Sequence, residues 1–333
     1  MNKVILLLFL LVLGLSCQPK KQIDGVWVLA YSQFISERDT FYSNECRFLS
    51  IKGNRFKYLE YIQPGYQIET VKSSGKFVKN GNRFVFNEYS DYSLELISID
   101  SENLIFGNQE QIQVYKKLPL TYFAPEWNPV GKNYSFIGNK GQAYFEFIND
   151  SLMLEYNKRT VEFEAKNWWL EEFEGYKFLV LNQTDVPQPI LIDSVDNEFV
   201  FISTYDTEIN NYPLREFPKN DITEKLEGNW VRLYEGLPPP FPESMIFQFE
   251  TFSVTADSVF AGNSTNPIKE KWLQTASGEK ILFPTAKSKR WRYWKILELK
   301  EDTIALDMPD VFVLDRPGIS NENRVLRFYT RSH

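Results

Sequence analysis

Residues 23–31 read IDGVWVLAY and residues 226–234 read LEGNWVRLY, and these two stretches decide the fold. Each has an aliphatic residue, an acid, a glycine, one spacer and a tryptophan, followed by residues that lead to a tyrosine. Two such matches rarely arise by chance in one chain, so they indicate an internal repeat. A weaker third start, PVGKNYSFI, lies at residues 129–137, where Tyr134 replaces the tryptophan. We therefore expect three similar units.

The later parts of the three units correspond as well. Each contains a strand-like run, an acidic turn and a second strand-like run, at residues 93–107, 189–203 and 295–308. Each then has a closing strand with an aromatic or basic residue, at residues 113–118, 212–217 and 326–331. The predicted units are residues 23–118, 130–217 and 226–331, and the second is degenerate. The segments between them are rich in proline or polar residues, as short linkers are.

Alternation of apolar and polar residues predicts antiparallel strands. In the second unit residues 143–148 alternate, Asn149 and Asp150 favour a turn, and residues 151–156 form the returning strand. Continuing this pattern gives about eight short strands, which can bury their edges by closing into a barrel. We predict an all-β fold of three tandem small antiparallel meander barrels or half-barrels. A β-propeller with two blades per unit is the alternative, but blade signatures are missing.

A glycine, a spacer and a tryptophan on the first strand, a meander, and a basic residue on the last strand resemble the small lipocalin-like domains of bacterial lipoproteins. In the wider lipocalin family this tryptophan packs across the closed end of the barrel, near the basic residue. The resemblance assigns the role of this tryptophan to Trp27 and Trp230. The basic partner would be Lys116 or Lys117 in the first unit and Arg331 in the third.

In the second unit the same resemblance suggests a degenerate pair, Tyr134 with Arg215. A guanidinium over an indole face stabilises a structure by about 0.5–2 kcal/mol and seals a barrel end that would otherwise be wet. These residues are therefore expected to be structural. They indicate the fold and not an activity.

The N-terminal residues read MNKVILLLFLLVLGLSCQPKK. Lys3 precedes an apolar run at residues 4–13, which is too short for a permanent transmembrane helix and is followed by small residues before Cys17. The segment resembles a bacterial lipoprotein signal, in which a leucine, a spacer and a small residue precede the cysteine. Here Gly14 occupies the leucine position.

This second resemblance implies that residues 1–16 are a cleaved signal peptide, that Cys17 is acylated and that residues 17–22 form the acylated tether. We therefore expect a cell-envelope protein that reaches its membrane through the N-terminal lipid, in the outer membrane of a Gram-negative bacterium. The alternative is an ordinary cleaved secretory signal with an incidental cysteine. With Cys17 acylated, Cys46 has no disulfide partner, and we expect it to be a small buried hydrophobic residue.

Composition argues against several functional classes. A formal net charge of -7, without a basic domain, argues against a nucleic-acid partner. The one histidine, His333, is the last residue, so we expect no histidine-based triad or zinc site. Phosphate-binding glycine loops and dinucleotide motifs are missing from the sequence. We predict no metal site, no cofactor and no catalytic residue of these kinds.

An aromatic segment near the C-terminus is the best candidate for contact with a ligand or partner. Residues 289–297 read KRWRYWKIL, and alternation places Trp291 and Tyr293 on one strand face and Arg292 and Trp294 on the other. We expect one of these faces to be exposed. Exposed rings beside arginine stack on sugars, bases or other proteins. Core packing or contacts between units is the alternative explanation.

The functional prediction is a noncatalytic binding or interaction module for a small ligand, a glycan or an envelope protein. Short strands and bulky side chains favour filled barrel interiors over a large cavity. The alternative is a carboxylate-based hydrolase acting on envelope or imported glycans, since 44 acidic residues offer many pairs. A pair of unusually titrating acids in a cleft beside Trp291 would favour the hydrolase.

Overall fold

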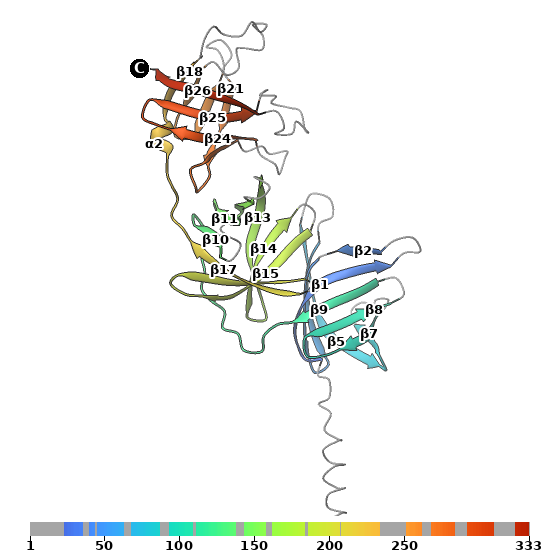
Figure 1. The fold of residues 1–333 in the computed structure, drawn as a ribbon. Helices are drawn as coiled ribbons and strands as arrows, with labels where there is room; N and C mark the ends of the chain where they lie inside the picture. The colour runs from blue at the N-terminus through green and yellow to red at the C-terminus, as the bar shows by residue number, and fades with distance from the viewer. Residues whose placement is uncertain are drawn as a thin grey trace, which may run out of the picture. The chain divides into compact units, whose positions relative to one another are not determined.

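Strands make up most of the described chain (Figure 1). The computed structural model describes residues 23–35, 40–43, 45–62, 68–86, 93–108, 111–137, 143–157, 162–183, 186–206, 208–233, 251–261, 268–283, 292–309 and 324–332. Within these ranges the helix that forms is the single turn α2 (Thr223–Leu226). None of the described helical structure is long and apolar enough to cross a membrane. The strands fall into three sheets in chain order, which confirms the prediction of tandem β-barrels.

The first sheet closes into a barrel because β1 pairs with both β3 and β9. The remaining strand, β2, extends the sheet by pairing with the far half of β1. All neighbouring strands are antiparallel, in the up-and-down order of a lipocalin-like barrel. The strands are β1 (Gly25–Ile35), β2 (Thr40–Ser43), β3 (Cys46–Lys52), β4 (Arg55–Ile62), β5 (Glu69–Asn80), β6 (Arg83–Phe86), β7 (Ser93–Ile99), β8 (Asn103–Gly107) and β9 (Gln111–Lys117).

The second sheet is also a closed barrel, in which the first and last strands pair with each other. Its strands are β10 (Asn133–Phe136), β11 (Ala143–Phe147), β12 (Leu152–Asn157), β13 (Glu162–Phe173), β14 (Tyr176–Gln183), β15 (Val186–Val195), β16 (Phe199–Tyr205) and β17 (Ile209–Glu216). Contacts divide the chain into two compact units, and this barrel contributes strands to both.

The third sheet is nearly closed. Its two end strands, β21 and β22, are separated along the chain by Trp272 alone. The strands are β18 (Gly228–Leu233), β19 (Thr251–Val254), β20 (Ser258–Ala261), β21 (Ile268–Lys271), β22 (Leu273–Gln274), β23 (Lys280–Phe283), β24 (Arg292–Leu299), β25 (Thr303–Pro309) and β26 (Arg324–Ser332). Buried aromatic and aliphatic side chains, Trp230 among them, fill its interior.

Trp27 and Trp230 occupy equivalent positions in the first and third barrels. Both indoles are fully buried on the first strand of their sheet. Trp27 Nε1 donates to the carbonyl of Ile23 at 3.1 Å, and Trp230 Nε1 donates to the carbonyl of Leu226 at 2.9 Å. In each case the acceptor lies four residues earlier, so the matching sequences produce matching local geometry.

Each of these tryptophans also carries a cation from the last strand. Lys117 Nζ lies 5.1 Å from the ring centroid of Trp27, and Arg331 Cζ lies 4.9 Å from that of Trp230. Both cationic residues are the direct register partners of the tryptophans. Gly25, two residues before Trp27, has φ +156°, and a Cβ there would lie 2.8 Å from Lys117 Cε. Gly25 therefore leaves space for Lys117, whereas a Cβ at Gly228 would lie at an ordinary contact distance, 3.5 Å, from Arg331 Nη1.

The second barrel starts differently, and the expected pair of Tyr134 with Arg215 is not formed. Tyr134 is in register with Glu216, so Arg215 points to the other face of the last strand. The guanidinium of Arg215 instead lies 3.3 Å from Glu198 as an exposed ion pair. Trp127 takes the neighbouring position, and its Nε1 donates to the hydroxyl of Tyr134 at 3.0 Å.

Strand β3 of the first barrel is buried on both faces. Its inward side chains face the barrel interior. Its outward Phe48 packs within the first compact unit against Phe173 at 5.5 Å and Phe178 at 4.5 Å between ring centroids. Cys46, on the same outward face, is a free and fully buried thiol, as predicted from its lack of a disulfide partner.

Candidate functional site

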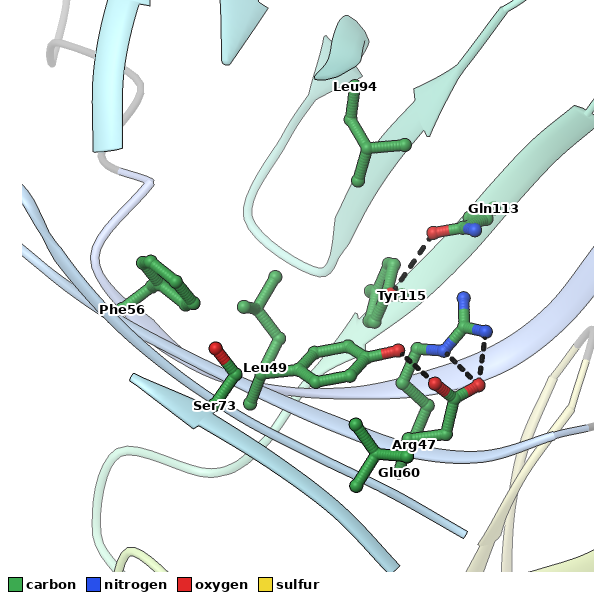
Figure 2. Close-up of a pocket in the computed structure, with 10 residues that line it drawn as sticks. Arg47, Leu49, Phe56, Glu60, Ser73, Leu94, Gln113 and Tyr115 are labelled. Atoms are coloured by element: carbon green, nitrogen blue, oxygen red, sulfur yellow. Dashed lines mark hydrogen bonds and ion pairs between the residues drawn. The ribbon is translucent and has the colours of Figure 1, made fainter. Parts of the chain in front are cut away.

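A cavity of about 260 Å³ lies inside the first barrel. Ligand pockets in proteins usually measure roughly 300–1,000 Å³, so this one is suited to a small ligand. Apolar side chains provide most of its wall, and a few polar groups converge on one part of it. The lining residues are Arg47, Leu49, Phe56, Tyr58, Glu60, Val71, Ser73, Leu94, Gln113 and Tyr115 (Figure 2).

Strand alternation brings these side chains inward. On β3, Arg47 follows the same face as Leu49, and on β4, Tyr58 and Glu60 follow the same face as Phe56. Leu49 is also the register partner of Trp27 at the closed end of the barrel. Arg47 lies two residues before Leu49 on β3 and is therefore further from that tryptophan.

A buried ion pair between Arg47 and Glu60 organises the polar part of the cavity. Arg47 Nε donates to Glu60 Oε1 at 3.1 Å, and Nη2 of the same guanidinium also donates to Oε1 (Figure 2). The hydroxyl of Tyr58 donates to the other oxygen, Oε2, at 2.6 Å. Both oxygens of Glu60 are thus occupied, and this carboxylate is held in place from two strands.

Glu45 is a second acid beside the same guanidinium. Its Oε2 lies 2.6 Å from Arg47 Nη2 as an ion pair, but without the geometry of a hydrogen bond. Burial raises the pKa of the Glu45 carboxyl; Arg47 opposes this shift, and Glu60 adds to it. One guanidinium therefore faces two carboxyl groups.

Two donors in this region have no hydrogen-bond partner among the described residues. One is Nη1 of Arg47, whose side chain is only 9% exposed, and the other is the hydroxyl of Ser32. Ser32 is fully buried and is the register partner of Gln113, which lines the cavity. A buried donor without a partner is costly. Of these two residues Arg47 lines the cavity, so its guanidinium is the group suited to receive an oxygen atom of a bound molecule.

Strand β9 adds a second polar point near Arg47. The hydroxyl of Tyr115 donates to Oε1 of Gln113 at 3.2 Å, and both residues belong to β9 (Figure 2). Leu94 and Phe56 provide apolar surface beside them. An apolar pocket with a few fixed polar groups is suited to amphipathic molecules. The apolar wall buries the apolar part of the ligand, and the polar groups orient its polar end.

The described residues contain no cluster of three or more histidine, cysteine or carboxylate side chains that could hold a metal ion. The donor set at this cavity is one guanidinium, two carboxyl groups, an amide and hydroxyls. Its carboxylates are already engaged with Arg47. The arrangement is suited to binding rather than to holding a cation.

The predicted aromatic contact residues lie elsewhere, and two of them are buried. Trp294 is 1% exposed, with its ring 5.3 Å from Phe252 and 4.8 Å from Phe283 in the interior of the third barrel. Tyr293 is 8% exposed on the other face of β24. The expected exposure of these two rings is therefore not found, and core packing explains Trp294.

Tyr293 is covered within the second compact unit. The ammonium group of Lys280 lies 4.7 Å from the ring centroid of Tyr293 and 4.3 Å from that of Tyr156 on β12. Leu154 and Leu282 belong to the same buried cluster. A cation between two rings is stabilising when it is desolvated, so Tyr293 serves a contact between strands of different sheets.

Cys17, Trp291 and the side chain of Arg292 were also predicted to be functional. Cys17 and Trp291 lie outside the described residues. Arg292 is the first residue of β24, but its side chain is not among those described. The structural residues Trp27, Trp230 and Arg331 are found together with their partners at barrel ends, as set out above.

Glu146 on β11 is a buried acid, 2% exposed. Burial raises the pKa of Glu146 to about 7, although the backbone N–H of Ala276 and the charge of Lys219 lower it. Ala276 N donates to Glu146 Oε2 at 2.8 Å. The acceptor and the donor are both buried within the second compact unit, so this hydrogen bond joins β11 to the segment before β23 and has a structural role.

Sequence reasoning missed the cavity and its polar residues. The sequence contains one indication of the site: Arg47 and Glu60 occupy positions that alternation assigns to the same faces as the inward apolar residues of β3 and β4. Two opposite charges at inward positions of adjacent strands are unusual, because charges are rarely buried unless paired.

No protein-family model matches the chain. No curated protein matches it. Among solved structures, a protein with unknown function from the DUF3598 family of Nostoc punctiforme is similar over 93% of this chain and 96% of its own, at 8% identity and a TM-score of 0.19. The assignment of the fold rests on the strand order and registers of this chain itself.

Proposed function

We propose that this protein is a noncatalytic binding module, anchored to the cell envelope by a lipid on Cys17, whose first barrel binds a small amphipathic molecule. The observation that carries the proposal is the cavity of about 260 Å³ with Arg47 in its wall. Most of the wall buries apolar surface, while Nη1 of Arg47 offers a donor that no described residue uses. The barrel fold is compatible with such a role.

The state of the charged groups supports binding rather than catalysis. A general acid or base must reach the reacting atom and exchange its proton near the working pH. Glu60 has both oxygens engaged by Arg47 and Tyr58. A carboxylate fixed in this way orients the guanidinium, and three hydrogen bonds hold its two oxygens in place.

The cellular part of the proposal is supported by the sequence before the first barrel. The apolar run at residues 4–13 and the small residues before Cys17 resemble a lipoprotein signal, with Gly14 at the leucine position, and the tandem barrels follow. We propose the outer membrane of a Gram-negative bacterium as the site of anchoring. The membrane would then be a partner through the lipid alone.

Two matched substitutions on β5 test the binding site. Val71 lines the cavity, whereas Val78, on the same strand, is 47% exposed. We expect the full chain carrying Cys17→Ser to bind 1-octanol or octanoate in calorimetric titration. Val71→Trp should abolish binding by filling the cavity, and Val78→Trp should leave it unchanged. Binding of neither probe, or equal binding by both variants, would contradict the proposal.

The carboxylate-based hydrolase remains the alternative from another class. Glu146 has the raised pKa that a general acid needs, but its Oε2 is held by the buried N–H of Ala276. Hydrolysis of an envelope glycan that disappears in Glu146→Gln, with the protein still folded, would favour this alternative over the binding module.

A further inference from the structure

We infer that the cavity of the first barrel selects a neutral ligand with a hydrogen-bond acceptor, such as an alcohol or carbonyl compound, over a carboxylate of the same length. This inference rests on the proposed function, because it concerns the chemistry of the molecule that the cavity binds. It follows from the charges that already surround Arg47.

The positive charge of Arg47 is already neutralised within the protein. Its Nε and Nη2 both donate to Glu60 Oε1, and Glu45 Oε2 lies 2.6 Å from Nη2. The described residues that line the cavity include no lysine or histidine. Two carboxyl groups of the protein thus face one cation. The described wall has no second cation that could pair with the carboxylate of a ligand.

A carboxylate ligand would therefore enter a region without a spare positive charge. Its interaction with Glu60 is repulsive, and in a desolvated site charges interact more strongly than in water. A neutral oxygen acceptor avoids that repulsion. It still satisfies the donor that Arg47 Nη1 presents, which is buried and without a partner among the described residues.

Ser32, the register partner of the lining residue Gln113, adds no positive charge beside the cavity. Its hydroxyl is the second buried donor of this region without a described partner, and it is uncharged. A hydroxyl or carbonyl oxygen accepts from such a donor as well as from a guanidinium. The preference for a neutral oxygen therefore rests on the two carboxyl groups that already face Arg47.

The size of the cavity sets the probes. An apolar cavity of about 150 Å³ accommodates benzene, and this cavity measures about 260 Å³. An eight-carbon chain with one terminal polar group is an appropriate length. 1-Octanol and octanoate have the same chain and differ in the charge of that group.

The test compares these two probes on the full chain carrying Cys17→Ser, by calorimetric titration at about pH 7.5, where octanoate is ionised. We expect 1-octanol to bind at least about tenfold more tightly than octanoate, because like charges in one site disfavour association. Equal or tighter binding of octanoate overturns the inference while leaving the proposed binding function intact. Binding of neither probe refutes the proposed function and the inference with it.

The second part of the test removes the negative charge of one carboxyl group beside Arg47. Glu60→Gln should narrow the preference, because one carboxyl group instead of two then faces the guanidinium of Arg47. Glu45→Gln should act in the same direction, and it replaces the first variant if Glu60→Gln does not fold. Glu95→Gln, at an exposed position of β7, is the matched control and should leave the ratio unchanged. An unchanged ratio in folded Glu60→Gln or Glu45→Gln also overturns the inference.

Discussion

The guanidinium of Arg331 lies over the indole of Trp230, with Cζ 4.9 Å from the ring centroid. Nη2 of the same guanidinium donates to the carbonyl of Lys225 at 2.7 Å. One side chain of the last strand therefore contacts the first strand and the helical turn before it. This closes one end of the third barrel by a hydrogen bond and a cation–π contact together.

Trp230→Ala should lower the free energy of unfolding by about 3–5 kcal/mol, because it removes a fully buried ring and its hydrogen bond. Trp27→Ala should have an effect of the same size. Chemical denaturation followed by circular dichroism measures both. Leu297→Ala, at a 51% exposed position, is the control, with an expected change within about 0.5 kcal/mol. Losses below about 1 kcal/mol for both tryptophans would argue against their role at the barrel ends.

Arg47→Leu should destabilise the first barrel by about 3–5 kcal/mol, because it leaves the carboxylate of Glu60 buried without its cation. Adding Glu60→Leu should recover much of this loss, since Glu45, the more exposed of the two acids, is then the one carboxyl group that lacks Arg47. Denaturation of the two single variants and the double variant forms a complete cycle. Additive losses in the double variant would show that the two side chains do not act as a buried pair.

The protein should lose stability as pH rises from about 4.5 to about 7 through the titration of Glu146. Burial raises its pKa in the folded state, so the folded protein binds this proton more tightly than the unfolded chain. The stabilisation is complete below the unfolded pKa and is lost as pH passes the folded pKa, by about 3 kcal/mol at most.

Glu146→Gln isolates this contribution, because glutamine has no carboxyl proton to lose and still offers an oxygen to Ala276. The measurement is the difference in thermal transition temperature between the natural protein and Glu146→Gln at several pH values from 5 to 8. That difference should shift in favour of the variant as pH rises. A difference that does not vary with pH contradicts the assigned titration.

Cys17→Ser should release the protein from the membrane, because the side chain expected to carry the lipid is lost. Fractionation of bacterial cells with a high-salt wash measures the distribution of the protein. Persistence of the variant in the membrane fraction after the wash would refute the lipid anchor.

The Cys17→Ser variant also leaves Cys46 as the one thiol in the chain. Burial raises the pKa of this thiol, and the carboxylates of Glu171 and Glu60 add to the effect. The thiolate is the reactive form, so labelling by a disulfide reagent should be slow in native protein and fast in denaturant. Fast labelling under native conditions would contradict the burial of Cys46.

The repeat of glycine, spacer and tryptophan was a good guide to the fold, because its geometry is local. The hydrogen bond from each indole spans four residues, and the glycine and the cation are set by the register of adjacent strands. The second barrel lacks the tryptophan, and there the sequence predicted the wrong pair. A one-residue offset sends Arg215 outward, and such an offset is invisible without the partner strand.

The candidate site was less predictable, because it depends on what each strand face meets. Alternation placed Tyr293 and Trp294 on opposite faces of β24, as the structure does. It gave no information on the side chains that cover Tyr293, which come from a part of the chain more than a hundred residues away. Likewise, the sequence does not show that Arg47 and Glu60 line a cavity, because the other walls of that cavity come from β5, β7 and β9.

Strand β3 has no face directed to solvent over most of its length. Arg47 and Leu49 face the cavity, and the outward Phe48 packs against β13 and β14. Few substitutions on such a strand should be neutral, because its side chains are constrained either by the cavity or by the packing outside the barrel. Among relatives of this protein, β3 should therefore diverge more slowly than β5, whose outward positions are exposed. An alignment of orthologues would show this as a difference in substitution rate between two strands of one sheet.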